Sequence, residues 1–192
     1  RNAVDPTVIG ITGTNGKTTT KELLWTILSA QYRCLKNEKN YNNEIGLPFT
    51  LLQLEATHEM AVVEMGMNHH GEIDRLTAIA RPDMAVITNV GEGHIEFLGG
   101  IEGVARAKSE IMNAMAEGSV VFINRDTECY DFLHSRAMEK NLRVVTFGIH
   151  GGADLVPDSY QLTAESVTVT VKGVSYTAPL YGLHNVYNIL AA

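Results

Sequence analysis

One stretch near the start of the chain, TVIGITGTNGKTTTKELL, constrains the possible folds more than any other. A short run rich in β-branched residues leads into a glycine-rich turn, and apolar residues with helical spacing follow directly. Strand, glycine-rich turn and helix in this order are typical of a loop that holds phosphate at a helix N-terminus. The stretch therefore predicts an α/β domain of the P-loop, nucleotide-binding type.

The loop departs from the general phosphate-loop pattern at one position. That pattern, G-x-x-x-x-G-K-[ST], ends here in Gly16-Lys17-Thr18, but Ile11 stands where its first glycine belongs. Backbone amides can still cradle an anion, with Lys17 on the terminal phosphates and Thr18 on Mg²⁺. The alternative is a glycine-rich turn with a solvated lysine. We expect the nucleotide to contact Gly13, Thr14, Asn15, Gly16, Lys17, Thr18 and Thr19.

The chain up to residue 150 continues to alternate between strand and helix patterns. Further strands are predicted at 59–66, 83–90, 118–124 and 142–148, and helices at 17–32, 71–80, 101–115 and 128–140. Short, wholly apolar strands between helices indicate a mostly parallel sheet with helices on both faces.

A different pattern begins near Gly151. The segment YQLTAESVTVTVKGVSYTAPL alternates with period two and carries a turn signal at Lys172-Gly173. We expect a small antiparallel β appendage over residues 151–182, close to the C-terminus of the chain, and the start of a helix in HNVYNILAA after it.

Composition excludes several classes of protein. Of the 192 residues, 45% are hydrophobic and 19% charged, which is ordinary for a globular protein with a core. The net charge of −7 argues against a nucleic-acid partner, whose phosphates need a basic face. Two cysteines make neither a disulfide framework nor a metal knuckle, and no apolar run reaches the roughly 18 residues of a membrane span. We therefore expect a cytoplasmic protein.

Two polar residues follow separate predicted strands at what should be one edge of the sheet. Glu64 ends the strand AVVE, and His94 lies in the loop after the strand that ends at Asn89. Ligands of open α/β sheets bind beyond the carboxyl ends of the strands. If these strands run parallel to the first, Glu64 and His94 face the phosphate loop as Mg²⁺ ligands, or position its waters. Taken alone, a loop histidine is more often surface decoration.

Lys108 stands in an apolar stripe of the predicted helix 101–115. It lies seven residues after Ile101 and three and four residues before Ile111 and Met112. A lysine there either extends its ammonium to water or works in a protected site. Burial would lower the pKa of its amine and favour the neutral form, which can be chemically modified.

The segment NEKNYNNEIGLP contains four asparagines, Asn37, Asn40, Asn42 and Asn43, before a glycine and a proline. Asparagine clusters usually mark turns. A loop rich in amide donors could also hold a negatively charged intermediate, and the residues themselves favour neither interpretation.

Five ordered blocks give the chain a resemblance to a known family. ITGTNGKTTTKELL, NNEIGLPFTLL, VVEMGMNHHGEI, ITNVGEGHIEFLGGIEGVARAKSEI and GLHNVYNILAA resemble the Mur ligases over Val8 to Ala192. The resemblance implies the central ATP-binding domain, residues 1–192, with the β appendage 151–182 inside it. It also implies that the uridine-nucleotide-binding N-terminal domain and the C-terminal domain fall outside the chain, so that this piece alone would not ligate.

The resemblance implies ATP-dependent amide formation in peptidoglycan precursor synthesis. In that reaction a UDP-muramoyl tripeptide receives D-alanyl-D-alanine through an acyl phosphate, with ATP and Mg²⁺ required. By likeness to the family, Lys17 holds the β/γ-phosphates and Thr18, Glu64 and His94 serve the metals. Other matched positions are Lys108, which in several members is carbamylated and supports the second metal, Asn42 and Asn43 near the acyl phosphate, and His184, Asn185 and Asn188 on the adenine side. Among these, Lys17, Lys108, His94 and Asn43 are the expected catalytic residues.

Two other interpretations remain open at this point. The chain could belong to another amide ligase of the same superfamily, such as a folylpolyglutamate or cyanophycin synthetase. It could also be a nucleotide-binding module or motor-type NTPase that ligates nothing, which would show no acceptor-dependent turnover. We expect a monomer.

Overall fold

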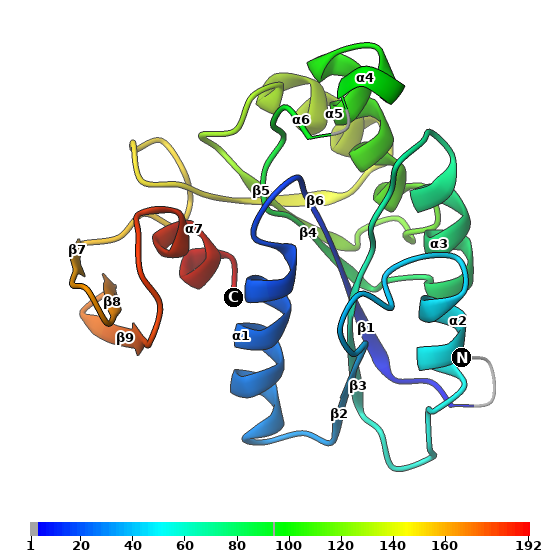
Figure 1. Ribbon diagram of the computed structural model, residues 1–192, viewed down its shortest axis with the longest axis horizontal. Helices are drawn as coiled ribbons and strands as arrows, with labels where there is room; N and C mark the ends of the chain where they lie inside the picture. Colours follow the sequence, from blue (N-terminus) through cyan, green and yellow to red (C-terminus); the bar gives the residue numbers. More distant parts are fainter. Residues whose placement is uncertain (1–3, 94) are drawn as a thin grey trace.

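Within residues 4–93 and 95–192, which the computed structural model describes, the chain forms a six-stranded and a three-stranded sheet (Figure 1). The six strands are β1 Thr7–Thr12, β2 Cys34–Lys36, β3 Met60–Glu64, β4 Met84–Ile87, β5 Val120–Asn124 and β6 Arg143–Phe147. The smaller sheet contains β7 Ser159–Leu162, β8 Val167–Val171 and β9 Val174–Ala178. The helices are α1 Lys17–Ser29, α2 Gly46–Leu51, α3 Glu72–Ala80, α4 Ile95–Leu98, α5 Ile101–Ser109, the 3₁₀ turn η1 Glu110–Met112, α6 Tyr130–Glu139 and α7 His184–Ala191.

The large sheet has the strand order β2-β3-β1-β4-β5-β6, and all of its neighbouring strands are parallel. The chain therefore leaves β1 on one side to form β2 and β3, and returns on its other side to form β4. A reversal of this kind opens a crevice at the carboxyl ends of the strands, where α/β proteins bind ligands. The phosphate loop follows β1 and lies at this point.

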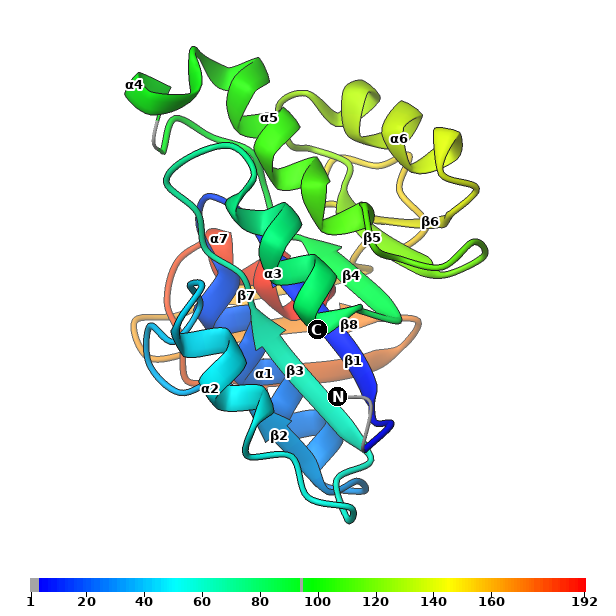
Figure 2. The ribbon, with the colours of Figure 1, turned by 90° about the vertical axis from the view of Figure 1, so that its right-hand side faces the viewer.

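The strands are apolar on both sides because helices cover both faces of the sheet. One face contributes Val8, Ala61, Val63, Ala85 and Ile87 to a core shared with α2, α3, α5 and α6. The other face contributes Ile9, Ile11, Val62 and Val86 to a core shared with α1 and α7. Figure 2 shows α2 and α3 in front of the sheet and α1 behind it. The predicted fold class is confirmed.

The β appendage is a three-stranded antiparallel meander, β7-β8-β9. Lys172 and Gly173 form the predicted turn, and both have positive φ, 51° and 77°, which a two-residue hairpin turn of the primed type requires. Val167 and Val169 of β8 are fully buried in the core that α1 and α7 share. The appendage is thus packed on the face of the large sheet that carries the phosphate loop helix.

The predicted helix 101–115 is shorter in the structure. Its α-helical part, α5, ends at Ser109, where the hydroxyl donates to the carbonyl of Arg106 at 2.7 Å, and a 3₁₀ turn follows. A side chain that binds its own helix backbone competes with the regular ladder. The structure also contains three elements that the periodicity did not predict, β2, α2 and α4, each six residues or shorter. No helix among the described residues is long and apolar enough to cross a membrane.

Candidate nucleotide-binding and catalytic site

The loop between β1 and α1 needs glycine at two positions. Gly13 and Gly16 have φ of 155° and 81°, and a Cβ at Gly16 would lie 2.2 Å from the side-chain oxygen of Asn188. A Cβ at Gly13 would lie 1.8 Å from the hydroxyl of Thr88. The loop therefore needs glycine where it touches Thr88, directly after β4, and Asn188 of α7.

The N-terminus of α1 is arranged to receive an anion. The first intrahelical hydrogen bond runs from the amide of Thr20 to the carbonyl of Gly16, at 2.8 Å. The amides that precede it point out of the helix end, where they and the helix dipole favour phosphate. Asn89, just after β4, fixes the loop that precedes these amides. Its side-chain oxygen accepts from the amides of Thr14 and Asn15 at 3.1 and 2.9 Å.

Lys17 lies at the same helix end and folds over the loop. Its ammonium donates to the carbonyls of Gly13 and Thr14 at 2.9 and 3.2 Å. Burial lowers the pKa of Lys17, and the nearby carboxylate of Glu64 opposes that shift. A partly buried lysine beside open helix amides is well placed to bind the terminal phosphates of a nucleotide.

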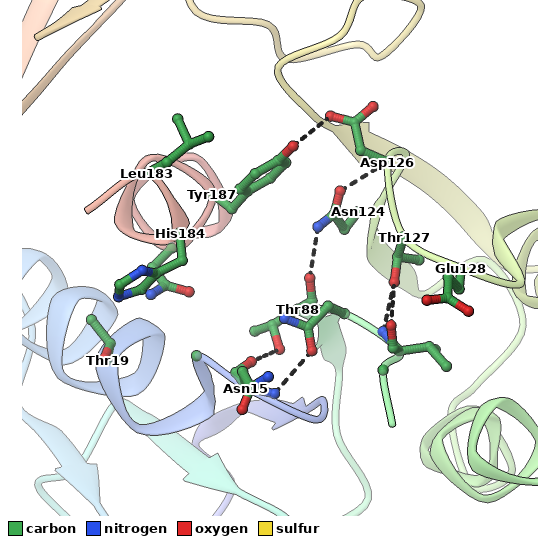
Figure 3. Close-up of a pocket in the computed structure, with 15 residues that line it drawn as sticks. Asn15, Thr19, Thr88, Asn124, Asp126, Thr127, Glu128, Leu183, His184 and Tyr187 are labelled. Atoms are coloured by element: carbon green, nitrogen blue, oxygen red, sulfur yellow. Dashed lines mark hydrogen bonds between the residues drawn. The ribbon is translucent and has the colours of Figure 1, made fainter. Parts of the chain in front are cut away.

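A cavity of about 820 Å³ opens beside the loop (Figure 3). We call it the base pocket, and its wall comes from the loop, α1, the ends of β4 and β5, and α7. The wall residues are Asn15, Gly16, Thr19, Thr88, Asn89, Val90, Gly91, Asn124, Asp126, Thr127, Glu128, Leu183, His184, Tyr187 and Asn188. A cavity of this size suits a small organic ligand.

Hydrogen bonds between segments distant in sequence hold the far wall of the base pocket in place. Asp126, after β5, accepts from the hydroxyl of Tyr187 at 3.1 Å (Figure 3). The same carboxylate also accepts from the amides of Ile149 and His150 at 2.7 and 3.2 Å. Desolvation and the carboxylate of Asp126 raise the pKa of Tyr187 to about 12, so this hydroxyl keeps its proton at neutral pH. Apart from Asp126 and Glu128, the polar groups of the wall are amides, hydroxyls and one imidazole.

A second group of residues surrounds Lys17 on the side away from the base pocket. We call this group the charged cluster, and its members are Lys17, Thr18, Asn42, Glu64 and Lys108. Glu64, only 2% exposed, accepts from the hydroxyl of Thr18 and from the side-chain amide of Asn42, each at 2.8 Å. Both carboxylate oxygens are therefore fixed next to the phosphate loop.

The donors of the charged cluster fit Mg²⁺. A hydroxyl and one carboxylate are hard oxygen ligands, and Mg²⁺ usually binds through one or two carboxylates together with substrate phosphates and water. Among residues 4–93 and 95–192, no group of three His, Cys, Asp or Glu side chains comes together as a metal site. Phosphate oxygens of a bound nucleotide would add further hard ligands to Thr18 and Glu64.

Lys108 is buried, as its position in the apolar stripe allowed. Its side chain is 3% exposed, and burial, reinforced by the positive charge of Lys17, lowers the pKa of its amine to about 7. The two lysines therefore approach each other from α1 and α5. At neutral pH a substantial part of Lys108 carries an uncharged, nucleophilic amine.

The Asn-rich segment is divided between structural and site roles. Asn43 accepts from the amides of Ile45 and Gly46 at 3.1 and 2.9 Å, an arrangement that fixes the start of α2. Its side chain also borders a cavity of about 210 Å³ that reaches Lys17 and Asn42. Asn43 is thus near the charged cluster, and its catalytic role stays a prediction.

The three predicted residues of α7 occupy different places. His184 and Asn188 line the base pocket, and their contacts with a nucleotide stay predictions. Asn185 is buried behind them, where its oxygen accepts from the amide of Asn188 at 2.8 Å and its own amide donates to the carbonyl of Tyr181. Asn185 therefore orients Asn188. His94 lies outside the described residues, so its predicted roles in metal binding and catalysis stay predictions.

Sequence reasoning missed most of the far wall of the base pocket. Thr88, Asn124, Asp126, Thr127 and Tyr187 were not among the predicted site residues. The signal was present in part, because the first four follow or end β4 and β5, which are neighbours in the sheet. Tyr187 lies one helical turn from His184, which makes it a neighbour on the same face of α7.

Comparison with known proteins identifies a family. Residues 11–192 match the Mur ligase middle domain. The UDP-N-acetylmuramoyl-tripeptide–D-alanyl-D-alanine ligase of Bacillus subtilis is 42% identical over 187 residues, which are 96% of this chain and 40% of that protein. The ligase of the same name from Escherichia coli is 34% identical, over all of this chain and 43% of its own length. The chain thus spans about two fifths of these relatives.

Solved structures give the same result. MurF from Acinetobacter baumannii superimposes with a TM-score of 0.88 at 35% identity, over 96% of this chain and 41% of that one. MurF from Thermotoga maritima, solved in complex with ADP, has a TM-score of 0.85 at 31% identity, over 99% of this chain and 44% of that one.

Proposed function

The chain belongs to the Mur ligase family, and we propose that it is the ATP-binding middle domain of a UDP-N-acetylmuramoyl-tripeptide–D-alanyl-D-alanine ligase. The observation that carries this proposal is the place of the phosphate loop, between a base pocket and a charged cluster. The substrates and the reaction are those named for the relatives at 42% and 34% identity.

The reaction proceeds in two steps. A carboxylate of the UDP-muramoyl tripeptide attacks the γ-phosphate of ATP, which breaks the bond to the β-phosphate and gives an acyl phosphate and ADP. The amine of D-alanyl-D-alanine then attacks the acyl carbon, and phosphate and a proton leave as the amide forms. Both steps develop negative charge near the γ-phosphate, so the enzyme needs positioned donors and cations there.

The residues of the chain divide this work. The amides at the start of α1 and the ammonium of Lys17 hold the β- and γ-phosphates, and the base pocket receives the nucleoside. Mg²⁺, where bound by Thr18 and Glu64, would neutralise phosphate charge. Asn42 keeps one oxygen of Glu64 in place, so the carboxylate stays directed at the phosphate loop.

Lys108 is proposed to be carbamylated. CO₂ adds to a neutral amine with loss of one proton and leaves an anionic carbamate, and the lowered pKa of Lys108 supplies that amine near pH 7. We expect ¹³CO₂ to give one carbamate signal in the ¹³C spectrum of the protein, with an intensity that rises between about pH 6 and 8 as the amine loses its proton. The Lys108→Ala variant should lose the signal, and a signal that persists in it would contradict this assignment.

Two further parts of the proposal concern partners and place. No nucleic acid is expected to bind, since the net charge is −7. A cytoplasmic location, a monomeric state and the dependence on Mg²⁺ are proposed with the function. By itself the 192-residue chain is proposed to bind nucleotide without adding peptide, because the relatives are more than twice as long.

The function is tested in a chimera. The middle domain of the B. subtilis ligase is replaced by this chain, and phosphate release is measured with UDP-MurNAc-tripeptide and D-alanyl-D-alanine. We expect phosphate release that requires both substrates and is lost in a chimera carrying Lys17→Ala. A folded chimera that releases no phosphate, or does so only with folate and glutamate, would refute the proposal and favour one of the other interpretations.

A further inference from the structure

Two fully buried polar residues near the charged cluster have no role in the mechanism above. Lys21, in the second turn of α1, and Asn37, directly after β2, are both 0% exposed. A buried ammonium is costly unless hydrogen bonds and a counter-charge satisfy it, so its partners indicate what it holds in place.

The side chain of Asn37 continues the β-ladder where β2 ends. The last residue pair between β2 and β3 is Lys36 with Val62. Beyond it, the Asn37 amide accepts from the backbone N–H of Glu64 at 2.9 Å and donates to the backbone carbonyl of Glu64 at 3.0 Å. One side chain therefore satisfies both backbone groups of Glu64 on this side and fixes the main chain that carries the carboxylate.

Asn37 also fixes the residue that holds the carboxylate of Glu64. Its amide nitrogen donates a second hydrogen bond, to the carbonyl of Tyr41 at 2.9 Å. Asn42 follows directly and donates to Oε1 of Glu64, while the Asn42 carbonyl accepts from the amide of Gly66 at 2.8 Å. Asn37 thus connects the backbone of Glu64 with the loop that orients its side chain.

Lys21 connects this arrangement to the phosphate loop helix. Its ammonium donates to the carbonyl of Asn37 at 2.7 Å and lies 3.3 Å from a carboxylate oxygen of Glu22. Lys21 is four residues after Lys17 on α1 and three residues after Thr18, whose hydroxyl donates to Oε2 of Glu64. Both oxygens of Glu64 are therefore set, directly or indirectly, by contacts that pass through α1 and Asn37.

We propose that Asn37 and Lys21 are positioning residues that fix Glu64 against Thr18, and thereby set how strongly a divalent cation binds together with a nucleotide. The inference rests on the proposed function, because it takes Thr18 and Glu64 as the cation ligands. Residues that orient metal ligands commonly change metal affinity about 10- to 100-fold when they are removed.

The test measures the coupling between Mg²⁺ and ADP in the 192-residue chain. Calorimetry gives the Kd of ADP in EDTA and in excess MgCl₂, and the ratio of the two is compared among variants. We expect the ratio of the Kd in EDTA to the Kd in MgCl₂ to be about tenfold smaller in Asn37→Ala, while the Kd in EDTA stays unchanged. Asn40→Ala is the matched control, since Asn40 is exposed in the same loop.

A second variant, Lys21→Met, keeps the buried volume and removes the ammonium, so it decides the matter if Asn37→Ala does not fold. Thermal unfolding followed by the fluorescence of Trp25, the one tryptophan of the sequence, reports which variants are folded. An unchanged ratio in the folded variants, or an equal loss of ADP affinity with and without Mg²⁺, overturns the positioning role. Absence of any ADP binding by the wild-type chain overturns the proposed function, and the inference with it.

Discussion

The base pocket and the charged cluster lie on either side of one helix N-terminus, yet they are built differently. The base pocket has a volume of about 820 Å³ and a wall of amides, hydroxyls and one imidazole, with two carboxylates at its far side. The charged cluster brings the buried carboxylate of Glu64 close to two lysines, Lys17 and Lys108, whose pKa values are lowered.

We propose that this difference separates recognition of the nucleoside, in the base pocket, from phosphate chemistry, in the charged cluster. Under the proposed function, neutral hydrogen-bonding groups would select a nucleoside without a large desolvation cost, whereas buried charges cost free energy that only a charged ligand offsets. The phosphate chain of a nucleotide would extend from the first region into the second. Changes in the charged cluster should therefore act on phosphate and Mg²⁺, and changes in the base pocket on the nucleoside.

The largest effect is expected from Lys17, which belongs to both the loop and the charged cluster. Lys17→Ala should weaken ADP binding about 100-fold, because charge-assisted hydrogen bonds to phosphate contribute about 1.5–3 kcal/mol. Calorimetry with the 192-residue chain measures this, with Lys140→Ala as the control of equal charge at the end of α6. Equal affinities in the two variants would show that the phosphates bind elsewhere.

A substitution at Glu64 should separate the two regions most clearly, because it should change the effect of Mg²⁺ and not the binding of ADP itself. Glu64→Gln should remove about tenfold of the gain in ADP affinity that Mg²⁺ provides, and leave binding in EDTA nearly unchanged. Glu165→Gln, an exposed position in the β7–β8 turn, serves as the control. If Glu64→Gln weakened ADP binding equally with and without Mg²⁺, Glu64 would act on the nucleotide and not on a cation.

The buried amine of Lys108 should make stability depend on pH. The folded chain releases the proton of Lys108 near pH 7, whereas the unfolded chain keeps it to about pH 10. Between these values the unfolded state binds more protons, so the free energy of unfolding should rise with pH, by up to about 1.4 kcal/mol per unit. Denaturant unfolding in CO₂-free buffer, relative to Lys108→Met, should show this slope, and parallel pH profiles would contradict a neutral Lys108.

The smallest effect is expected in the base pocket. His184→Ala should weaken ADP binding about fivefold, the equivalent of one neutral hydrogen bond, and leave the effect of Mg²⁺ intact. His150→Ala, an exposed histidine outside the pocket wall, is the matched control in the same titration. A loss of Mg²⁺ coupling in His184→Ala would mean that the two regions are not separable.

The sequence predicted the parts of this molecule that depend on local pattern. Apolar runs predicted five of the six parallel strands. The strand β2 was not predicted, because its three residues are all half-buried and too few to show a hydrophobic pattern. Lys108 was found because a charge in an apolar stripe is a conflict that local pattern exposes.

Contacts between segments that are distant in the sequence could not be predicted in the same way, because they depend on the order of the strands in the sheet. Asp126 and Tyr187 meet across 61 residues, and only the packing of α7 over the end of β5 brings them together. Asn37 is equivalent to any turn asparagine in the sequence, since its pairing with Glu64 arises from the parallel register of β2 and β3.

The most direct test of the account is a crystal structure of the 192-residue chain with Mg²⁺ and ADP. The account predicts the adenosine in the base pocket beside His184, and the β-phosphate at the amides of α1 and the ammonium of Lys17. It also predicts a cation bound by the hydroxyl of Thr18 at about 2.1 Å, on the side of Glu64. A nucleotide bound away from the loop, or one whose phosphates leave Lys17 and Thr18 without contact, would contradict it.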